Sequence, residues 1–339
     1  MLLWLTMDQD LASQMMQMMM GGVVAQSISV AAELGIADQL AGGEKSSAQL
    51  AALVSADEQK IHRLLRFLAT VGIFEANADG AWRLTPLAQL LLNDGPHSVR
   101  AGARMLGRMS ATYPHMTENV RTGKCAYNLT FGRPIFQDLS AKPEDAAIFD
   151  AAMNSFHGGE TEAVLDAYSY EGIRVLADIG CGAGAVMTAT LKRYPALRGM
   201  MFDQSHVLNR TTQNIQAAGL QDRCEMHTGN FFEAIPAGAD AYSMRHILHD
   251  WTDDLCVRIL RNIRKVTPAH GRLLIIEAVV PEGNDPSMSK LFDIFMMIFP
   301  DGKERTEAEY RNLLSAGGFM LRSVTTTRSP VSVIDARPV

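Results

Sequence analysis

The chain has 339 residues, enough for two domains. Apolar residues make up 47% and charged residues 20%, as in ordinary globular proteins. The net charge of −6 excludes a chain-wide positive field that would attract nucleic acid or an anionic membrane. The four cysteines form no CxxC pair, which argues against a zinc knuckle or a disulfide framework and predicts a reducing, cytoplasmic location.

The first stretch, MLLWLTMDQDLASQMMQMMMGG, is apolar in patches and rich in methionine. It lacks a positively charged start, and Asp8 and Asp10 interrupt it, so we expect neither a signal peptide nor a membrane span. Methionine often only fills gaps in a core. The run LASQMMQMMMGGVVAQSISV is nevertheless too apolar to stay exposed on a monomer, which predicts an amphipathic helix that packs on a second copy of the chain.

Residues 1–100 have the pattern of a winged helix, with short helices followed by one hairpin. In SADEQKIHRLLRFLATVG, Ser55 and Glu58 predict a capping box ahead of apolar residues at helical spacing. Two short strands are expected around Asp79-Gly80, and Pro86 then starts another helix. Winged helices can bind DNA, but this segment has six Lys/Arg against ten Asp/Glu, so we expect no nucleic-acid partner.

Residues 101–165 are expected to be mostly helical, and from about residue 172 strands alternate with helices. The predicted strands include IRVLADIG, LRGMMFD, RCEMHTG, ADAYSMR and GRLLIIEAVV. FMLRSVTTT and VSVIDARPV predict a final hairpin. The alternation predicts an α/β fold: a Rossmann-like, doubly wound, mostly parallel sheet with an antiparallel edge.

A glycine-rich loop, ADIGCGAGAV, follows the first of these strands and opens a helix. Gly180 and Gly182 let the backbone approach a ligand closely, and Asp203 ends the next strand, where a carboxylate can accept hydrogen bonds from ribose hydroxyls. The glycines alone would also suit a nicotinamide cofactor, or a tight turn with no ligand.

Three residues change this balance toward a cationic cofactor. Asp178, two positions before the first glycine, would repel a pyrophosphate but suits a cation. Asn230 and Phe231 follow the strand RCEMHTG, where they can cradle an adenine. A sulfonium cofactor with an adenosine and an amino-acid tail would use all of these groups.

The stretch MRHILHDWTDD places His246 and His249 three residues apart. They could be metal ligands, a catalytic base with its neighbour, or two ordinary polar residues. Zinc sites of the HExxH type place their histidines four apart on a helix, whereas these two lie at a strand end, where side chains are expected to diverge. We therefore expect no metal site and a structural role for His246.

Five features of the sequence occur in a characteristic order: DIGCGAG, the acid at Asp203, RHILHDW, the glutamate that ends LLIIEAVV, and GKERTEAEY. With them the chain resembles the class I S-adenosylmethionine-dependent O-methyltransferases of the caffeic acid/hydroxyindole/phenazine type. The resemblance covers nearly the whole chain. It implies a winged-helix dimerisation domain at residues 1–100, a helical linker and acceptor-pocket segment at 101–165, and a cofactor-binding methyltransferase domain at 166–339.

The resemblance also assigns the cofactor contacts. Gly180 and Gly182 would line the methionine part of S-adenosylmethionine. The adenosine contacts would come from Asp203 at the ribose, Asn230 and Phe231 at the adenine, and Arg245 nearby with Trp251 packed beside it. Asn230 departs from the family's usual aspartate and lacks its charge.

The same resemblance makes His249 the catalytic base and Glu277 and Glu304 the carboxylates that orient its ring. The chemistry agrees, because a phenol with a pKa of about 10 is a poor nucleophile until a base such as a neutral imidazole takes its proton. The acceptor contacts would come from AAMNSFHGG and LFDIFMMIFPDG. The residues expected there are Met153, Asn154, His157, Phe292, Met296 and Met297.

The expected reaction is therefore methylation of a hydroxyl on a small aromatic compound, phenolic or polyketide-like. Methylation of nitrogen remains open. So does a relative that binds the cofactor but catalyses a hydroxylation or a pericyclic step, although His249, Glu277 and Glu304 together weigh against it. A DNA-binding regulator with a vestigial cofactor site is disfavoured by the acidic first hundred residues.

Overall fold

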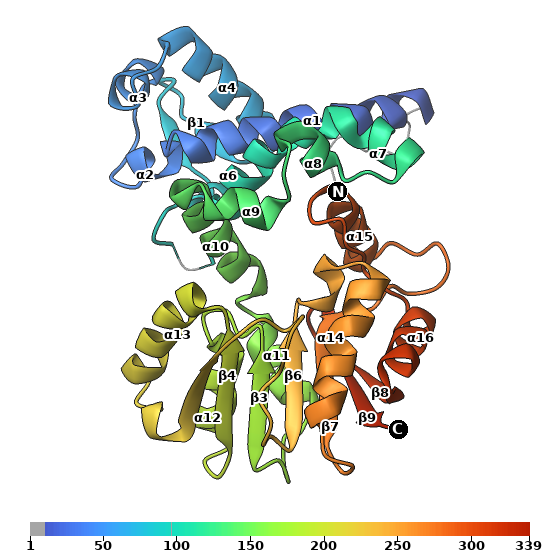
Figure 1. The fold of residues 1–339 in the computed structure, drawn as a ribbon. Helices are drawn as coiled ribbons and strands as arrows, with labels where there is room; N and C mark the ends of the chain where they lie inside the picture. Colours follow the sequence, from blue (N-terminus) through green and yellow to red (C-terminus); the bar gives the residue numbers. More distant parts are fainter. Residues whose placement is uncertain (1–10, 96) are drawn as a thin grey trace. The chain divides into compact units, whose positions relative to one another are not determined.

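The computed structural model describes residues 11–95 and 97–339 (Figure 1). Asp8 and Asp10 lie outside these residues. The chain divides into two compact units, Met1–Pro114 with Phe136–Gly158, and His115–Ile135 with Gly159–Val339. The stretch 101–165 therefore contributes to both units.

The N-terminal unit begins with a long helix, α1 (Leu11–Glu33), most of whose apolar surface is uncovered. Of its 23 residues, only Ser29, Ala31 and Ala32 are buried. In the described part of the chain, α1 alone is long and apolar enough to cross a membrane by length and composition. Its exposed large apolar side chains are those of Leu11, Met15, Met16, Met18, Met19, Met20, Val23 and Val30.

Short helices and a hairpin follow, around a small apolar core. They are α2 (Ile36–Leu40), α3 (Ser47–Leu53), α4 (Glu58–Thr70), β1 (Phe74–Ala76), β2 (Trp82–Leu84) and α5 (Pro86–Gln89). The predicted capping box at Ser55 is wrong: Asp57 caps α4 by accepting from Lys60 N at 2.9 Å, while Ser55 has a left-handed φ of 53°. Pro86 does begin α5, with Thr85 as its N-cap.

Three further helices complete this unit: α6 (Arg100–Met109), α9 (Ile135–Ser140) and α10 (Pro143–His157). Helix α6 packs against both α1 and α10. Glycines allow this close approach, because a Cβ at Gly102 would come within 2.5 Å of the Phe156 ring and one at Gly107 within 1.6 Å of Ser29 Oγ.

The second unit is built on a seven-stranded sheet of order β5-β4-β3-β6-β7-β9-β8. The first five strands in this order are parallel, and β9 pairs antiparallel with both β7 and β8. The predicted mostly parallel sheet with an antiparallel edge is confirmed. Its strands are β3 (Val175–Ile179), β4 (Arg198–Asp203), β5 (Cys224–Thr228), β6 (Ala241–Arg245), β7 (Arg272–Ala278), β8 (Phe319–Thr326) and β9 (Val331–Pro338).

Helices cover both faces of this sheet (Figure 1). On one face α11 (Glu160–Ala167), α12 (Ala185–Arg193) and α13 (Ser205–Ala217) pack on residues such as Leu176 and Leu274. On the other, α14 (Asp253–Val266) and α16 (Glu307–Gly317) pack on Ala177 and Ile275. Strand residues alternate between the two cores, as period-two geometry requires. The unit also contains α7 (Met116–Thr122), α8 (Ala126–Phe131) and α15 (Met288–Ile298).

Candidate active site

The glycine loop lies between β3 and α12, at the carboxyl ends of the parallel strands, where ligands bind in open α/β sheets. Gly180 and Gly182 have left-handed φ values of 72° and 52°. A Cβ at Gly180 would come within 2.3 Å of Ile247 Cδ1, so a larger residue would disturb the loop. A Cβ at Gly182 would meet nothing within 4 Å, so this part of the loop is open to a ligand.

Asp203 stands beside this loop at the end of β4. Its Oδ2 accepts from Gly182 N at 3.0 Å and its Oδ1 from Gln204 N at 2.7 Å. A carboxylate has about four acceptor sites, so these two bonds leave places for the hydroxyls of a ribose. Burial raises the pKa of Asp203, and the two backbone donors oppose that effect. The loop and this carboxylate fit an adenosyl cofactor.

Asp178, the other acid near the loop, is enclosed within the sheet. Its carboxylate accepts from Ser243 Oγ at 3.1 Å, and its side chain is buried. Burial raises its pKa to about 6, although Ser243 and the nearby Arg245 oppose this. The structure thus shows a sheet-internal contact for Asp178, and a contact with the cofactor remains a prediction.

The expected adenine residues lie after β5. Asn230 Oδ1 accepts from Phe232 N at 3.0 Å, which closes a turn and occupies part of the amide oxygen's capacity. The Phe231 ring lies 6.1 Å from the Trp251 ring between centroids. Arg245 Nη1 donates to Thr161 Oγ1 at 3.2 Å. Phe231 and Trp251 therefore share one aromatic cluster, and the packing of Trp251 beside Arg245 remains a prediction.

His249 lies in a 3-10 turn, Leu248–Asp250, between β6 and α14. Its Nδ1 is 2.8 Å from Glu304 Oε1, and both residues are buried. Its Nε2 is 3.6 Å from Asp250 Oδ1. With Nδ1 committed to Glu304, Nε2 is the nitrogen left for proton exchange with a bound molecule.

The charges around His249 favour its protonated form. Burial by itself lowers the imidazole pKa, but Asp250, the hydrogen bond to Glu304 and the charge of Glu277 outweigh it and raise the pKa to about 10. Asp250 also shifts, because burial raises its pKa to about 6. These carboxylates therefore stabilise the imidazolium relative to the neutral ring that a general base requires.

Glu277, at the end of β7, differs from its expected role. Its Oε1 accepts from the backbone N–H groups of Ile247 and Leu248 at 3.0 and 2.6 Å, and its Oε2 accepts from Tyr310 OH at 2.6 Å. Glu277 thus holds the backbone that leads to His249, and its oxygens do not bond to the imidazole in the described contacts. Its influence on the imidazole ring itself is through charge.

His246 also differs from expectation, because the two histidines do not diverge. Their ring centroids are 5.1 Å apart. His246 has a φ of 54°, an uncommon value for a residue other than glycine, and this left-handed turn after β6 brings the rings together. Its Nε2 lies 2.8 Å from Glu160 Oε2, on the first turn of α11.

Comparison with known proteins identifies the family of this chain. Residues 113–320 match the O-methyltransferase domain and residues 16–94 the O-methyltransferase dimerisation domain. The chain is 39% identical over 330 residues to phenazine O-methyltransferase PhzM of Lysobacter antibioticus, covering 97% of each chain.

The chain belongs to the S-adenosylmethionine-dependent O-methyltransferase family.

Two further comparisons support this assignment. The methyltransferase is 36% identical to mitomycin biosynthesis 6-O-methyltransferase of Streptomyces lavendulae, over 94% of this chain and 92% of the relative. The crystal structure of LaPhzM superposes with a TM-score of 0.92 at 38% identity, over 98% of this chain and 100% of that chain. The enzyme is an O-methyltransferase whose cofactor is S-adenosylmethionine.

The residues predicted to contact the acceptor belong to the two different units of the enzyme, so their meeting in one pocket remains a prediction. Asn119 Nδ2 donates to Met297 O at 3.4 Å, which ties α15 to α7. Gly302 N donates to Met296 O at 3.2 Å. Phe292, Met296 and Met297 are half-buried on α15, and Met153, Asn154 and His157 lie on α10.

Two residues at the site were not singled out from the sequence. Tyr310, on α16, is fully buried and holds Glu277. Asp293, on α15, accepts from Glu304 N at 3.0 Å. The sequence TEAEY contained a signal for Tyr310. Thr306 and Glu309 form the capping box that starts α16, and the start of a helix determines the side on which Tyr310 lies.

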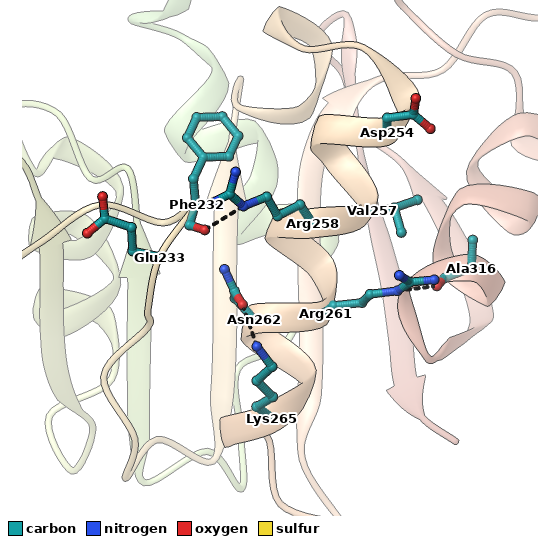
Figure 2. Close-up of a pocket in the computed structure, with 9 residues that line it drawn as sticks. All are labelled: Phe232, Glu233, Asp254, Val257, Arg258, Arg261, Asn262, Lys265 and Ala316. Atoms are coloured by element: carbon teal, nitrogen blue, oxygen red, sulfur yellow. Dashed lines mark hydrogen bonds between the residues drawn. The ribbon is translucent and has the colours of Figure 1, made fainter.

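A separate hollow lies along α14 of the methyltransferase, where Arg258, Arg261 and Lys265 recur on one side of the helix (Figure 2). Arg258 donates to Phe232 O at 2.7 Å and Arg261 to Ala316 O at 3.3 Å, so both side chains tie neighbouring backbone. None of the residues predicted for cofactor, acceptor or proton transfer lines it. The remaining lining residues are Glu233, Asp254, Val257 and Asn262.

Proposed function

We propose that this enzyme methylates a hydroxyl group of a small aromatic natural product, phenolic or polyketide-like, with His249 as the general base. The observation that carries the proposal is the buried pair of His249 Nδ1 and Glu304 Oε1 at 2.8 Å. A carboxylate at Nδ1 fixes the tautomer and leaves Nε2 to receive a proton.

S-adenosylmethionine, when bound, supplies the methyl sulfonium and a positive charge. Gly180 and Gly182 would hold its methionine part, and Asp203 its ribose. Phe231, Asn230 and Arg245 would surround the adenosine, with Trp251 packed on Phe231. These roles rest on the open loop at Gly182 and on the acceptor capacity that remains at Asp203.

A general base must first be neutral. Since the surrounding carboxylates raise the pKa of His249 to about 10, the reactive form is the one from which this proton has left. Any positive charge that enters the site opposes the imidazolium and lowers that pKa. The rate of methylation is therefore expected to rise with pH above the ordinary imidazole range, and a neutral His249 of raised pKa is a stronger base toward a phenol.

The acceptor class follows from two supports. Half-buried Phe292, Met296 and Met297 offer aromatic and thioether surface that suits a flat ring. Two relatives are named for phenazine and mitomycin O-methylation. We further propose a homodimer formed through α1, supported by its uncovered apolar residues and by the match to a dimerisation domain.

The proposal is tested with methyl-labelled S-adenosylmethionine and a panel of a hydroxyphenazine, a dihydroxynaphthoate and an aminophenol, with products identified by mass spectrometry. O-methylated product and S-adenosylhomocysteine are expected together. His249→Ala should lower turnover about 10²–10⁴-fold, with the smallest loss for acidic phenols that are already ionised.

Three other results would count against the proposal. Methylation of nitrogen alone, or an oxidised product without S-adenosylhomocysteine, would reassign the reaction. Loss of activity in EDTA, with His246→Ala as damaging as His249→Ala, would indicate a metal site. Near-normal methylation of a weakly acidic phenol by His249→Ala would leave proximity as the main contribution.

A further inference from the structure

Arg305 follows Glu304 directly and is the largest of the fully buried side chains in the described residues, only 1% exposed. A buried guanidinium must be paired and hydrogen-bonded, because its desolvation is costly. The acceptors that satisfy it show what the side chain holds in place.

Two of these acceptors flank the proposed base. Nη1 donates to Leu248 O at 3.0 Å and Nη2 to Trp251 O at 3.0 Å. These carbonyls lie immediately before and two residues after His249, at the first residue of its turn and at the residue that follows it. Because backbone carbonyls at both ends are held by one rigid, planar group, the turn cannot shift independently of Arg305.

A third acceptor lies on the other side of the His249–Glu304 pair. Nη1 also donates to Lys303 O at 3.2 Å, immediately before Glu304. Lys303 N in turn donates to His249 O at 2.8 Å. One guanidinium thus ties the turn that carries the imidazole to the segment that carries its carboxylate.

The two backbones are also in direct contact at Gly302. A Cβ at this position would come within 1.8 Å of His249 O, which leaves no room for a different register. Asp253 Oδ1 balances the charge of Arg305 by accepting from Nε at 3.0 Å and Nη2 at 2.7 Å. Since the Asp253 side chain is 61% exposed, this ion pair lies at the rim and not within the pair it supports.

We propose that Arg305 is a positioning residue for methyl transfer, which keeps His249 Nδ1 within hydrogen-bond distance of Glu304 by holding both segments in one register. Its side-chain hydrogen bonds go to backbone carbonyls, Asp253 and Cys256, so it acts on the reaction through the residues that it holds. The inference rests on the proposed function, because it gives Arg305 a role only through His249.

The test compares Arg305→Lys with Arg311→Lys. Lysine keeps the charge but loses the fork of donors that reaches three carbonyls. Arg311 is a matched arginine on α16, exposed and paired with Glu307, so its variant controls for the substitution itself. With a hydroxyphenazine as acceptor, kcat should fall at least about 10-fold in Arg305→Lys, while calorimetry shows unchanged affinity for S-adenosylmethionine.

A second readout needs no acceptor. The ring of His249, assigned by comparison with His249→Gln, is titrated by NMR. In Arg305→Lys it should lose its proton at lower pH than in the parent enzyme, because the Glu304 contact loosens while the positive charge stays. The kcat losses of Arg305→Lys and Glu304→Gln should also be less than multiplicative in the double variant.

These readouts separate the possible failures. If Arg305→Lys lowers only the melting temperature, and the His249 titration and kcat stay as in the parent, then Arg305 merely supports the core and the proposal is overturned. If the titration shifts while the parent methylates no acceptor, the proposed function fails but the positioning role stands. Should the lysine variant be unfolded by circular dichroism, Arg305→Gln takes its place, and a parental titration there overturns the proposal.

Discussion

Replacing Glu304 by glutamine tests the His249–Glu304 pair with little change of shape. The contact is 2.8 Å long and Glu304 is only 3% exposed. A hydrogen bond to a charged group contributes about 1.5–3 kcal/mol, and 1.36 kcal/mol corresponds to a tenfold change in rate. If this stabilisation is realised when the imidazole takes a proton, Glu304→Gln should lower kcat by about 10–150-fold.

The same change should shift the pH dependence of the methylation rate. Without the Glu304 hydrogen bond and charge, the pKa of His249 falls from its raised value of about 10, so the rising limb of the rate should lie at lower pH. The stability effect has a defined sign. A raised imidazole pKa stabilises the fold fully below the unfolded pKa of about 6.5, and this stabilisation is lost as pH rises through about 10.

The assay is the pH–rate profile of methylation between about pH 6 and 10.5, with unfolding followed in parallel. Glu307→Gln is the control, because Glu307 is an exposed glutamate on α16 that pairs with Arg311 at 2.7 Å and makes no contact with His249 in the described residues. If Glu304→Gln keeps the parental kcat, and its methylation rate rises over the same pH range as in the parent enzyme, the carboxylate does not support the base and the reasoning is refuted.

Three further predictions follow from other parts of the structure. Asp203→Ala should weaken S-adenosylmethionine binding, measured by calorimetry, by about 1–3 kcal/mol, because the ribose hydroxyls lose their acceptors. Unchanged affinity in this variant, or tight NAD binding by the parent enzyme, would contradict the assignment. Asp178→Asn should raise the free energy of unfolding at pH 7 by up to about 3 kcal/mol, measured in urea. The pKa of Asp178 is raised from 3.8 to about 6, so its ionisation destabilises the fold as pH rises through this range, whereas the amide stays neutral and can still accept a hydrogen bond from Ser243. The double variant Met15→Ser with Met19→Ser should shift light scattering from dimer toward the 37.1 kDa monomer, and an unaltered dimer would exclude this face of α1 as the interface.

The sheet could be predicted from sequence because its signals are local. Each buried strand is a short apolar run, and each helix between strands has apolar residues at helical spacing, so the order of elements follows without tertiary information. The glycine loop and Asp203 fall at adjacent strand ends for the same reason, and the hydrogen bond from Gly182 N to Asp203 shows that they meet.

The residues that were misjudged or not singled out depend on geometry with no sequence signature. Strand periodicity predicts that His246 and His249 diverge, but the left-handed φ at His246 overrides it. Glu277 was expected at the imidazole, yet backbone N–H groups that need an acceptor take its oxygen first. Arg305 stood within the motif GKERTEAEY, but only the fold shows that its donors reach carbonyls about 55 residues earlier in the chain.

The position of β9 has a consequence for the order in which the enzyme matures on the ribosome. Strand β7, which ends in Glu277, has β9 as its neighbour on one side, with Glu277 opposite Ser332. Synthesis proceeds from the N-terminus, so β7 emerges as an open sheet edge well before residues 331–338 exist. The edge of β7 beside Glu277 is therefore covered only once these late residues insert between β7 and β8. A nascent chain that stops before β9 would leave the apolar edge of β7 open, so pairing with β9 is the step that protects the strand carrying Glu277 from association with other chains.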